Sequence, residues 1–104
     1  MVSNRSLPLP VLQALRKLGR DLAIARRKRG ISTSDMAGRL FVSRDTLWRL
    51  ERGDSTVSIG TLATAAFVLQ FHDRLASLAA PEKDTLGLTL DEQRLPQRIR
   101  RPRA

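Results

Sequence analysis

The sequence predicts an all-α fold of five helices followed by a C-terminal tail, and three observations support this. Apolar residues recur every three or four positions between residues 12 and 78. Ser32, Ser43 and Ser58 each stand directly before such a periodic segment, where a serine side chain can cap a helix N-terminus. The length of 104 residues suits one domain with a single modest core.

The first predicted helix follows an irregular leader, residues 1–10, which ends with Pro8 and Pro10. Basic residues and then Gly30 mark its C-terminus, where a cationic side chain and a glycine are favourable. The expected inward stripe consists of Leu12, Leu15, Leu18, Leu22 and Ala25.

Two short helices are expected next, capped by Ser32 and Ser43, with Asp35 in the capping position after Ser32. A loop follows, and Ser58 then caps a fourth helix with an apolar face. We expect a fifth helix from about Gln70 to Ala79. The inward residues of these four helices are Met36, Ala37, Leu40, Leu47, Leu50, Ile59, Leu62, Ala66, Leu69, Phe71, Leu75 and Leu78.

The domain is therefore expected to span residues 11–80 and to be followed by a tail, residues 81–104, that is flexible or binds a partner. Pro81 ends the helical pattern. Leu86, Leu88 and Leu90 alternate with small or polar residues, which predicts a short strand. The last residues, RIRRPRA, predict an exposed basic tail.

Charge favours a polyanionic partner. The formal net charge is +9, of which residues 1–31 carry +7, residues 32–80 carry zero and residues 81–104 carry +2. A protein this basic most often meets nucleic acid. The basic first helix could also suit a membrane surface, but its apolar stripe has a use inside a helical bundle.

Residue types argue against several other classes. The chain has no cysteine, no tyrosine and one histidine, His72, so we expect no enzyme activity, no metal and no cofactor. His72 is expected at the surface or an interface. There is no secretory signal pattern at the N-terminus and no apolar run of the roughly 18 residues that a bilayer requires. We therefore expect a cytoplasmic, nucleoid-associated protein without a membrane partner.

The segment DMAGRLFVSRDTLWRLERG, residues 35–53, carries the clearest functional pattern. Ala37 is small enough for a second helix to cross over it, and Met36, Leu40, Val42, Leu47 and Leu50 can lock the two helices together. Ser43, Arg44, Asp45 and Arg49 then face outward. This arrangement predicts a helix-turn-helix whose second helix enters the DNA major groove.

The segment TSDMAGRLFVSRDTLWRLERG resembles the helix-turn-helix of the Cro/repressor (XRE) family, whose domains have five helices. The resemblance covers about residues 15–80. The wider pattern from RLERGDSTVS to RLPQRIR resembles HipB-type antitoxins, which pair with HipA-type kinase toxins. The resemblance implies groove contacts at Ser43, Arg44, Asp45 and Arg49, a phosphate contact at Thr33, and a buried ion pair between Arg26 and Glu51.

Residue chemistry gives each outward position a role. Arg44 and Arg49 can each bond guanine O6 and N7. Asp45 can accept from cytosine N4 or orient one of these arginines. Thr46 can touch the DNA or simply serve the helix cap, and Trp48 can touch the DNA or cover a neighbouring helix. The expected phosphate-binding set is Arg27, Lys28, Arg29, Thr33, Thr46 and Arg52.

Phe41 stands in the predicted turn, where the backbone usually requires positive φ. We expect the motif to survive with Phe41 left-handed, at a cost of about 1 kcal/mol that ring packing on a neighbouring helix recovers. Further along the chain, the apolar surface exceeds what a small monomer needs, which predicts a two-fold dimer interface. The expected interface residues are Phe67, Phe71, Leu75 and Leu78.

Two functions fit these observations. The first is a homodimeric repressor on a palindromic double-stranded operator that is also a HipB-like antitoxin, autoregulating its operon and binding a HipA-like kinase toxin. The alternative is a stand-alone XRE-family or phage-type regulator without a toxin partner.

Overall fold

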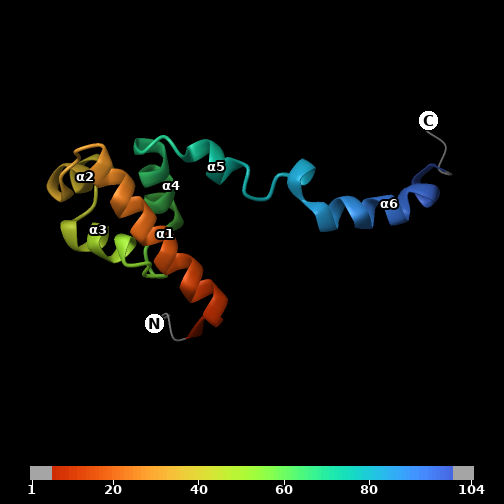
Figure 1. Ribbon diagram of the computed structural model, residues 1–104, viewed down its shortest axis with the longest axis horizontal. Helices are drawn as coiled ribbons and strands as arrows, with labels where there is room; N and C mark the ends of the chain where they lie inside the picture. Colours follow the sequence, from red (N-terminus) through yellow and green to blue (C-terminus); the bar gives the residue numbers. More distant parts are fainter. Residues whose placement is uncertain (1–5, 100–104) are drawn as a thin grey trace.

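The computed structural model describes residues 6–99, and the side chains of residues 6–94. The described part is all-helical, which confirms the predicted fold class (Figure 1). Its elements are α1 (Leu9–Lys28), α2 (Thr33–Leu40), α3 (Arg44–Glu51), α4 (Ile59–Val68), α5 (His72–Ala76), the 3-10 segment η2 (Pro81–Lys83) and α6 (Thr85–Ile99).

Three serine caps begin α2, α3 and α4 as predicted. The hydroxyl oxygens of Ser32, Ser43 and Ser58 accept hydrogen bonds from the backbone N–H groups of Asp35, Thr46 and Thr61, at 3.0, 3.1 and 3.0 Å respectively. Each cap satisfies one of the amides that a helix N-terminus leaves without a partner.

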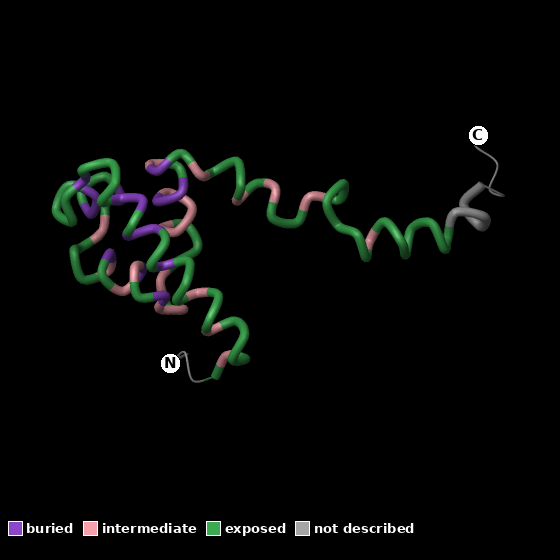
Figure 2. The backbone as a smooth tube through the Cα atoms, in the orientation of Figure 1, coloured by how far each residue is buried: buried purple, intermediate pink, exposed green. Residues whose placement is uncertain are grey.

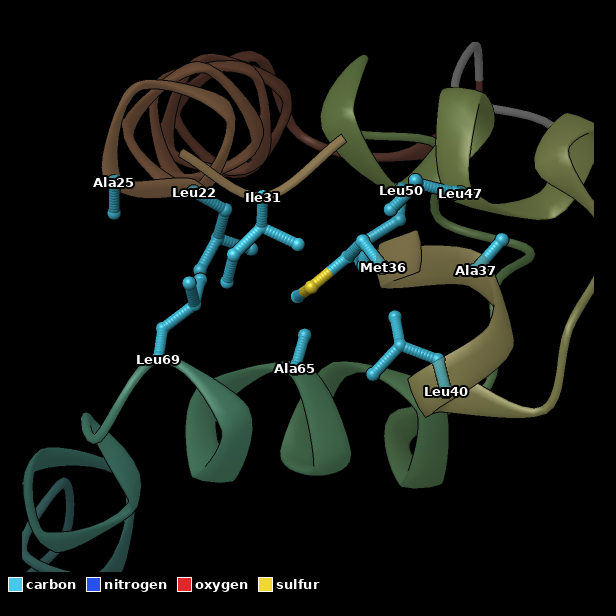
Figure 3. Close-up of a cluster of buried hydrophobic side chains, with 10 residues drawn as sticks. All are labelled: Leu22, Ala25, Ile31, Met36, Ala37, Leu40, Leu47, Leu50, Ala65 and Leu69. Atoms are coloured by element: carbon cyan, nitrogen blue, oxygen red, sulfur yellow. The ribbon is translucent and has the colours of Figure 1, made fainter. Parts of the chain in front are cut away.

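The core lies where α1, α2, α3 and α4 meet, and Figure 2 shows that the buried backbone is confined to this body. Met36, Leu47 and Leu69 are its largest fully buried side chains. Figure 3 shows side chains from α2, α3 and α4 pointing toward one another beneath α1. The whole cluster consists of Leu22, Ala25, Ile31, Met36, Ala37, Leu40, Leu47, Leu50, Ala65 and Leu69.

Glycine allows α1 to lie directly against the end of α3. A Cβ atom on Gly19 would come within 2.6 Å of the Glu51 carbonyl oxygen. One on Gly53, where φ is +78°, would come within 2.6 Å of the Leu15 carbonyl oxygen. Because only glycine leaves room for this approach, the two residues set the depth at which α1 and α3 pack.

Two helix boundaries differ from the prediction. α1 begins at Leu9, inside the expected leader, because the first turn of a helix tolerates proline and Pro10 therefore does not delay its start. α5 covers only His72–Ala76. The left-handed residue Gln70, with φ of 67°, separates it from α4 instead of beginning it.

The predicted strand is wrong. Leu86, Leu88 and Leu90 lie on α6, a helix of 15 residues that begins after Asp84. The Asp84 carboxylate accepts a hydrogen bond from the Gly87 backbone N–H at 2.9 Å, which caps the helix. α6 packs against η2 and projects away from the body formed by α1–α4 (Figure 1). The expected basic tail extends into residues 100–104, which lie outside the described residues.

Phe41 has the left-handed backbone that was predicted, with φ of 55° and ψ of 40°. The Val42 N–H bonds the Ala37 carbonyl at 3.1 Å and the Phe41 N–H bonds the Gly38 carbonyl at 3.2 Å, so the end of α2 is satisfied. The expected ring packing is wrong, because Phe41 is 93% exposed. Val42, rather than Phe41, packs against the core and ties the turn to it.

Replacing Phe41 by glycine should stabilise the protein by about 1 kcal/mol, because glycine adopts this backbone without a steric penalty. Urea unfolding would measure the change. Phe41→Ala is the matched control: it removes the exposed ring but keeps the Cβ that causes the strain. A glycine variant no more stable than the alanine variant would contradict the assigned strain.

Candidate nucleic-acid interface

The outward face of α3 is set by what α3 buries. Leu47 and Leu50 are buried in the core. The opposite side of the helix presents residues spaced three and four apart, as one helical face requires: Arg44, Asp45, Trp48 and Arg52, all exposed. This is the surface that a helix-turn-helix offers to the major groove.

Arg44 and Asp45 stand in the first turn of α3, where base edges are read. Within the described part of the chain, neither side chain makes a hydrogen bond or ion pair, so the Arg44 guanidinium keeps its donors available. The structure does not pair Asp45 with Arg44 or Arg49. Its carboxylate lies in the first turn instead, where negative charge suits the helix dipole.

Arg49 points elsewhere. Its Nε donates to Asp54 Oδ2 at 3.1 Å and its Nη2 donates to Thr56 Oγ1 at 2.8 Å. The five-residue spacing from Arg44 rotates Arg49 well around the helix, toward the loop that follows α3. The structure therefore gives Arg49 a role in bracing this loop, not the outward position that the sequence suggested.

Asp54 is the centre of this loop. Its Oδ1 also accepts from the Thr56 hydroxyl at 2.7 Å and from the Thr56 backbone N–H at 2.8 Å. These two bonds from Thr56, with a smaller contribution from Arg49, hold the pKa of Asp54 below its ordinary value of 3.8. The carboxylate is therefore charged at neutral pH and keeps Arg49 in place.

Trp48 is 57% exposed, and the Arg52 guanidinium lies 4.6 Å from the centre of its ring. This cation–π contact holds both side chains on the outer surface of α3. Because most of the Trp48 ring is exposed, it does not serve to cover a neighbouring helix among the described residues.

The hydroxyls of Ser43 and Thr46 serve the helix cap. They lie 3.1 Å apart, and the Ser43 oxygen also accepts from the Thr46 N–H. Ser43 is exposed, while Thr46 is half-buried. The capping role considered for Thr46 is the one that the structure shows.

The expected phosphate contacts divide into two groups. Arg27 and Lys28 at the end of α1, and Thr33 in the first turn of α2, are exposed and have no side-chain partner among the described residues. Arg29 instead donates to the Ala25 carbonyl at 3.0 Å and lies 5.1 Å from the Phe71 ring centre. The structure thus gives Arg29 a place at the α1–α5 contact, in contrast to the expected phosphate contact.

Arg26 and Glu51 form a two-bond ion pair across 25 residues. Arg26 Nε and Nη2 donate to the two Glu51 carboxylate oxygens at 2.8 and 3.2 Å. Arg26 Nη1 also donates to the Ile31 carbonyl oxygen at 2.8 Å. The side chains are only 9% and 15% exposed, so this pair ties α1 and the α1–α2 turn to the last residue of α3.

Sequence reasoning missed four residues that position this surface: Gly19, Gly53, Asp54 and Thr56. An isolated glycine inside a helical pattern signals a close backbone approach, and Gly19 carries that signal. The pairing of Asp54 and Thr56, two apart in a loop, is the ordinary pattern of an Asx-turn.

The described residues offer little support for a metal site or a membrane span. They contain no cluster of histidine and carboxylate side chains that could hold a metal ion. His72 lies on the surface against the Phe67 ring, with 5.4 Å between the ring centres. None of the described helices is long and apolar enough to cross a bilayer.

Glu51→Gln should destabilise the fold by about 3–5 kcal/mol, because it leaves the buried Arg26 charge without its carboxylate. Denaturant unfolding would measure the loss. The exposed pair Lys17–Asp21, with 2.6 Å between its charged atoms, offers a matched control: Lys17→Ala should cost less than about 1 kcal/mol. The double variant Arg26→Leu/Glu51→Leu should recover most of the lost stability, because it removes both buried charges. If Glu51→Gln and Lys17→Ala cost the same, the Arg26–Glu51 pair does not have the importance assigned to it.

Acid should lower the stability that Asp54 gives to the loop after α3. Because the folded state lowers the pKa of Asp54, its charge stabilises the fold above the ordinary value of 3.8, and this contribution is lost as pH falls through the lowered pKa. Asp54→Asn should therefore be less stable than the natural protein at neutral pH, and the gap should close in strong acid. Thr56→Val, which removes one donor, should give a smaller gap at neutral pH. A pH-independent gap would contradict this.

A comparison with protein-family models matches residues 17–78 to a helix-turn-helix domain. The match covers more than half of the chain, from the third turn of α1 through α5. No curated protein and no solved structure matches the chain. The chain therefore belongs to the helix-turn-helix domain family, a family of DNA-binding domains and not of enzymes.

Proposed function

We propose that the protein is a sequence-specific transcriptional repressor that binds a palindromic operator as a homodimer. The observation that carries this proposal is the state of α3: it is fixed to the core by Leu47 and Leu50, while Arg44 keeps an uncommitted guanidinium on the outer face. An arginine at the start of a recognition helix can read guanine O6 and N7 in the major groove.

The roles divide along the chain. In this proposal Arg44 reads bases, with Asp45 and Ser43 beside it, and Arg49 supports the surface through Asp54. Exposed groups at the end of α1 and the start of α2 bind phosphates and set the register. These groups are Arg27, Lys28 and Thr33. On α3, the exposed Arg52 and the half-buried Thr46 complete the proposed phosphate-binding set.

The dimer is proposed to form on the side of α4 and α5. Phe67 and Leu78 are exposed there, while Phe71 and Leu75 are half-buried. A two-fold axis through this side would place two recognition helices in successive major grooves, about 34–36 Å apart. The operator would then share the symmetry of the dimer.

An antitoxin role is the second candidate. It is supported by the resemblance of the loop and tail to HipB-type antitoxins, and by the exposed helix α6, which provides surface for a partner. Co-expression with the product of the neighbouring gene, followed by pull-down, would test for a HipA-like kinase toxin. Operator binding without any such partner would favour the stand-alone regulator.

Arg44→Ala should relax base preference at one operator position, with a loss of about 1–3 kcal/mol of discrimination. Lys28→Ala should weaken binding to all sequences alike and flatten the salt slope by about one unit. Fluorescence anisotropy on a fragment from upstream of the gene would measure both against scrambled DNA.

Two outcomes of that titration contradict the proposal. Equal affinity of the natural protein for operator and scrambled DNA would exclude specific recognition. Identical behaviour of the two variants would exclude the division between base reading and phosphate binding.

A further inference from the structure

An open apolar groove of about 760 Å³ runs along α1, beside α4 and α5. Its apolar lining includes Leu18, Ile24, Leu62, Phe71, Leu75 and Leu78. From Leu15 to Arg29 the lining follows α1 for about 21 Å, at 1.5 Å per residue. A groove of this length can hold a helix that places a large apolar side chain in it and polar side chains along its rim.

The rim of this groove is basic. Lys28, Arg29 and Arg74 stand along it, and Asp21 is the one carboxylate among the lining residues. Arg29 and Arg74 lie 5.1 and 4.8 Å from the centre of the same Phe71 ring. Within the described part of the chain, none of the three cations forms an ion pair, so the rim favours an acidic occupant.

α6 has the complementary character. Leu88 is 49% exposed on this helix. Asp84 lies one turn before Leu88, and Asp91 and Glu92 lie one turn after it, so acidic residues flank an apolar position on one face. Residues 81–94 hold four acidic and two basic side chains. The 15 residues of α6 extend over about 22 Å, which matches the length of the groove.

The connection to α6 directs it away from its own groove. Backbone hydrogen bonds join Ala80 to Ser77, Lys83 to Ala80 and Asp84 to Pro81, so the segment between α5 and α6 is held in successive turns. Figure 1 shows α6 projecting from the body on the far side of α5, and Figure 2 shows it exposed along most of its described length. Within the described part of the chain the groove stays open and α6 stays largely exposed, so a symmetry-related chain can supply the helix that fills the groove.

We propose that α6 of each chain docks into the α1–α4–α5 groove of a second copy, so that two chains exchange helices. The inference rests on the homodimer of the proposed function and names the segment that joins its subunits. The Leu88 face enters the groove, and the acidic side chains of α6 meet Arg29 and Arg74 on its rim.

Cysteine pairing tests the exchange, since the natural chain has no cysteine. Two full-length single variants, Ile24→Cys in the groove and Leu88→Cys on α6, carry different tags and are mixed under mild oxidation. We expect a disulfide between the two tagged chains. Leu86→Cys, two positions away and so on nearly the opposite face of α6, is the matched control and should pair poorly.

The pattern of disulfides shows whether the groove holds α6 of a second chain or α6 of the same chain. A disulfide confined within single chains of the Ile24→Cys/Leu88→Cys double variant would overturn the exchange, because α6 would then fold onto its own groove. Equal pairing from position 86, or no pairing at all, would overturn it as well.

Analytical ultracentrifugation of the full chain measures dimerisation independently. Leu88→Asp should weaken dimerisation about tenfold or more, because one leucine is lost from each of two symmetric contacts. Leu86→Asp should leave dimerisation unchanged, and circular dichroism would check that both variants fold. If Leu88→Asp dimerises normally and still binds the operator, the exchange fails while the proposed function stands. If the natural chain is monomeric and does not prefer operator over scrambled DNA, both fail.

Discussion

The contact between Arg26 and Glu51 determines how the recognition helix is presented. Both carboxylate oxygens and the Ile31 carbonyl are used by one guanidinium, so its direction is set by three acceptors at once. Because the pair is largely buried, any rotation of α3 relative to α1 would leave a charge without compensation. Gly19 removes the side chain that would otherwise keep the two helices apart. The outward face of α3 follows from this joint.

The arginines show that a basic chain does not offer all its charge to a partner. Arg26 is committed to Glu51, Arg29 to the end of α1 and Phe71, and Arg49 to Asp54. Each of these has an acceptor within reach that fixes local structure. Arg27, Lys28 and Arg44 make no such contact among the described residues, so they keep the donors that phosphates and bases require. Arg26, Arg29 and Arg49 thus hold the surface in shape, while Arg27, Lys28 and Arg44 remain available to bind a ligand on it.

Size explains why the protein presents so much apolar surface. The body of α1–α4 buries a modest core, and its α1–α4–α5 side remains an open groove. A small domain cannot close every helix face within one chain. An exchange of α6 would cover the groove and the Leu88 face together. In the proposed dimer, the exchanged helices would also fix the distance between the two recognition helices, and the operator would then have a defined half-site separation.

Local chemistry made much of the fold predictable from sequence. The serine caps, the left-handed Phe41 and most of the apolar stripes each depend on residues only a few positions apart, so propensity and spacing predicted them. Three residues of the predicted inward set, Leu18, Ile59 and Leu78, are exposed instead. The family resemblance pointed to the distant Arg26–Glu51 pair. Only the tertiary structure decided that Arg49 turns to Asp54, that Arg29 turns to Phe71, that Phe41 stays exposed and that residues 85–99 are helical. Those outcomes depend on which partners the folded chain brings within reach, and an alternating leucine pattern cannot form a strand where no second strand is near.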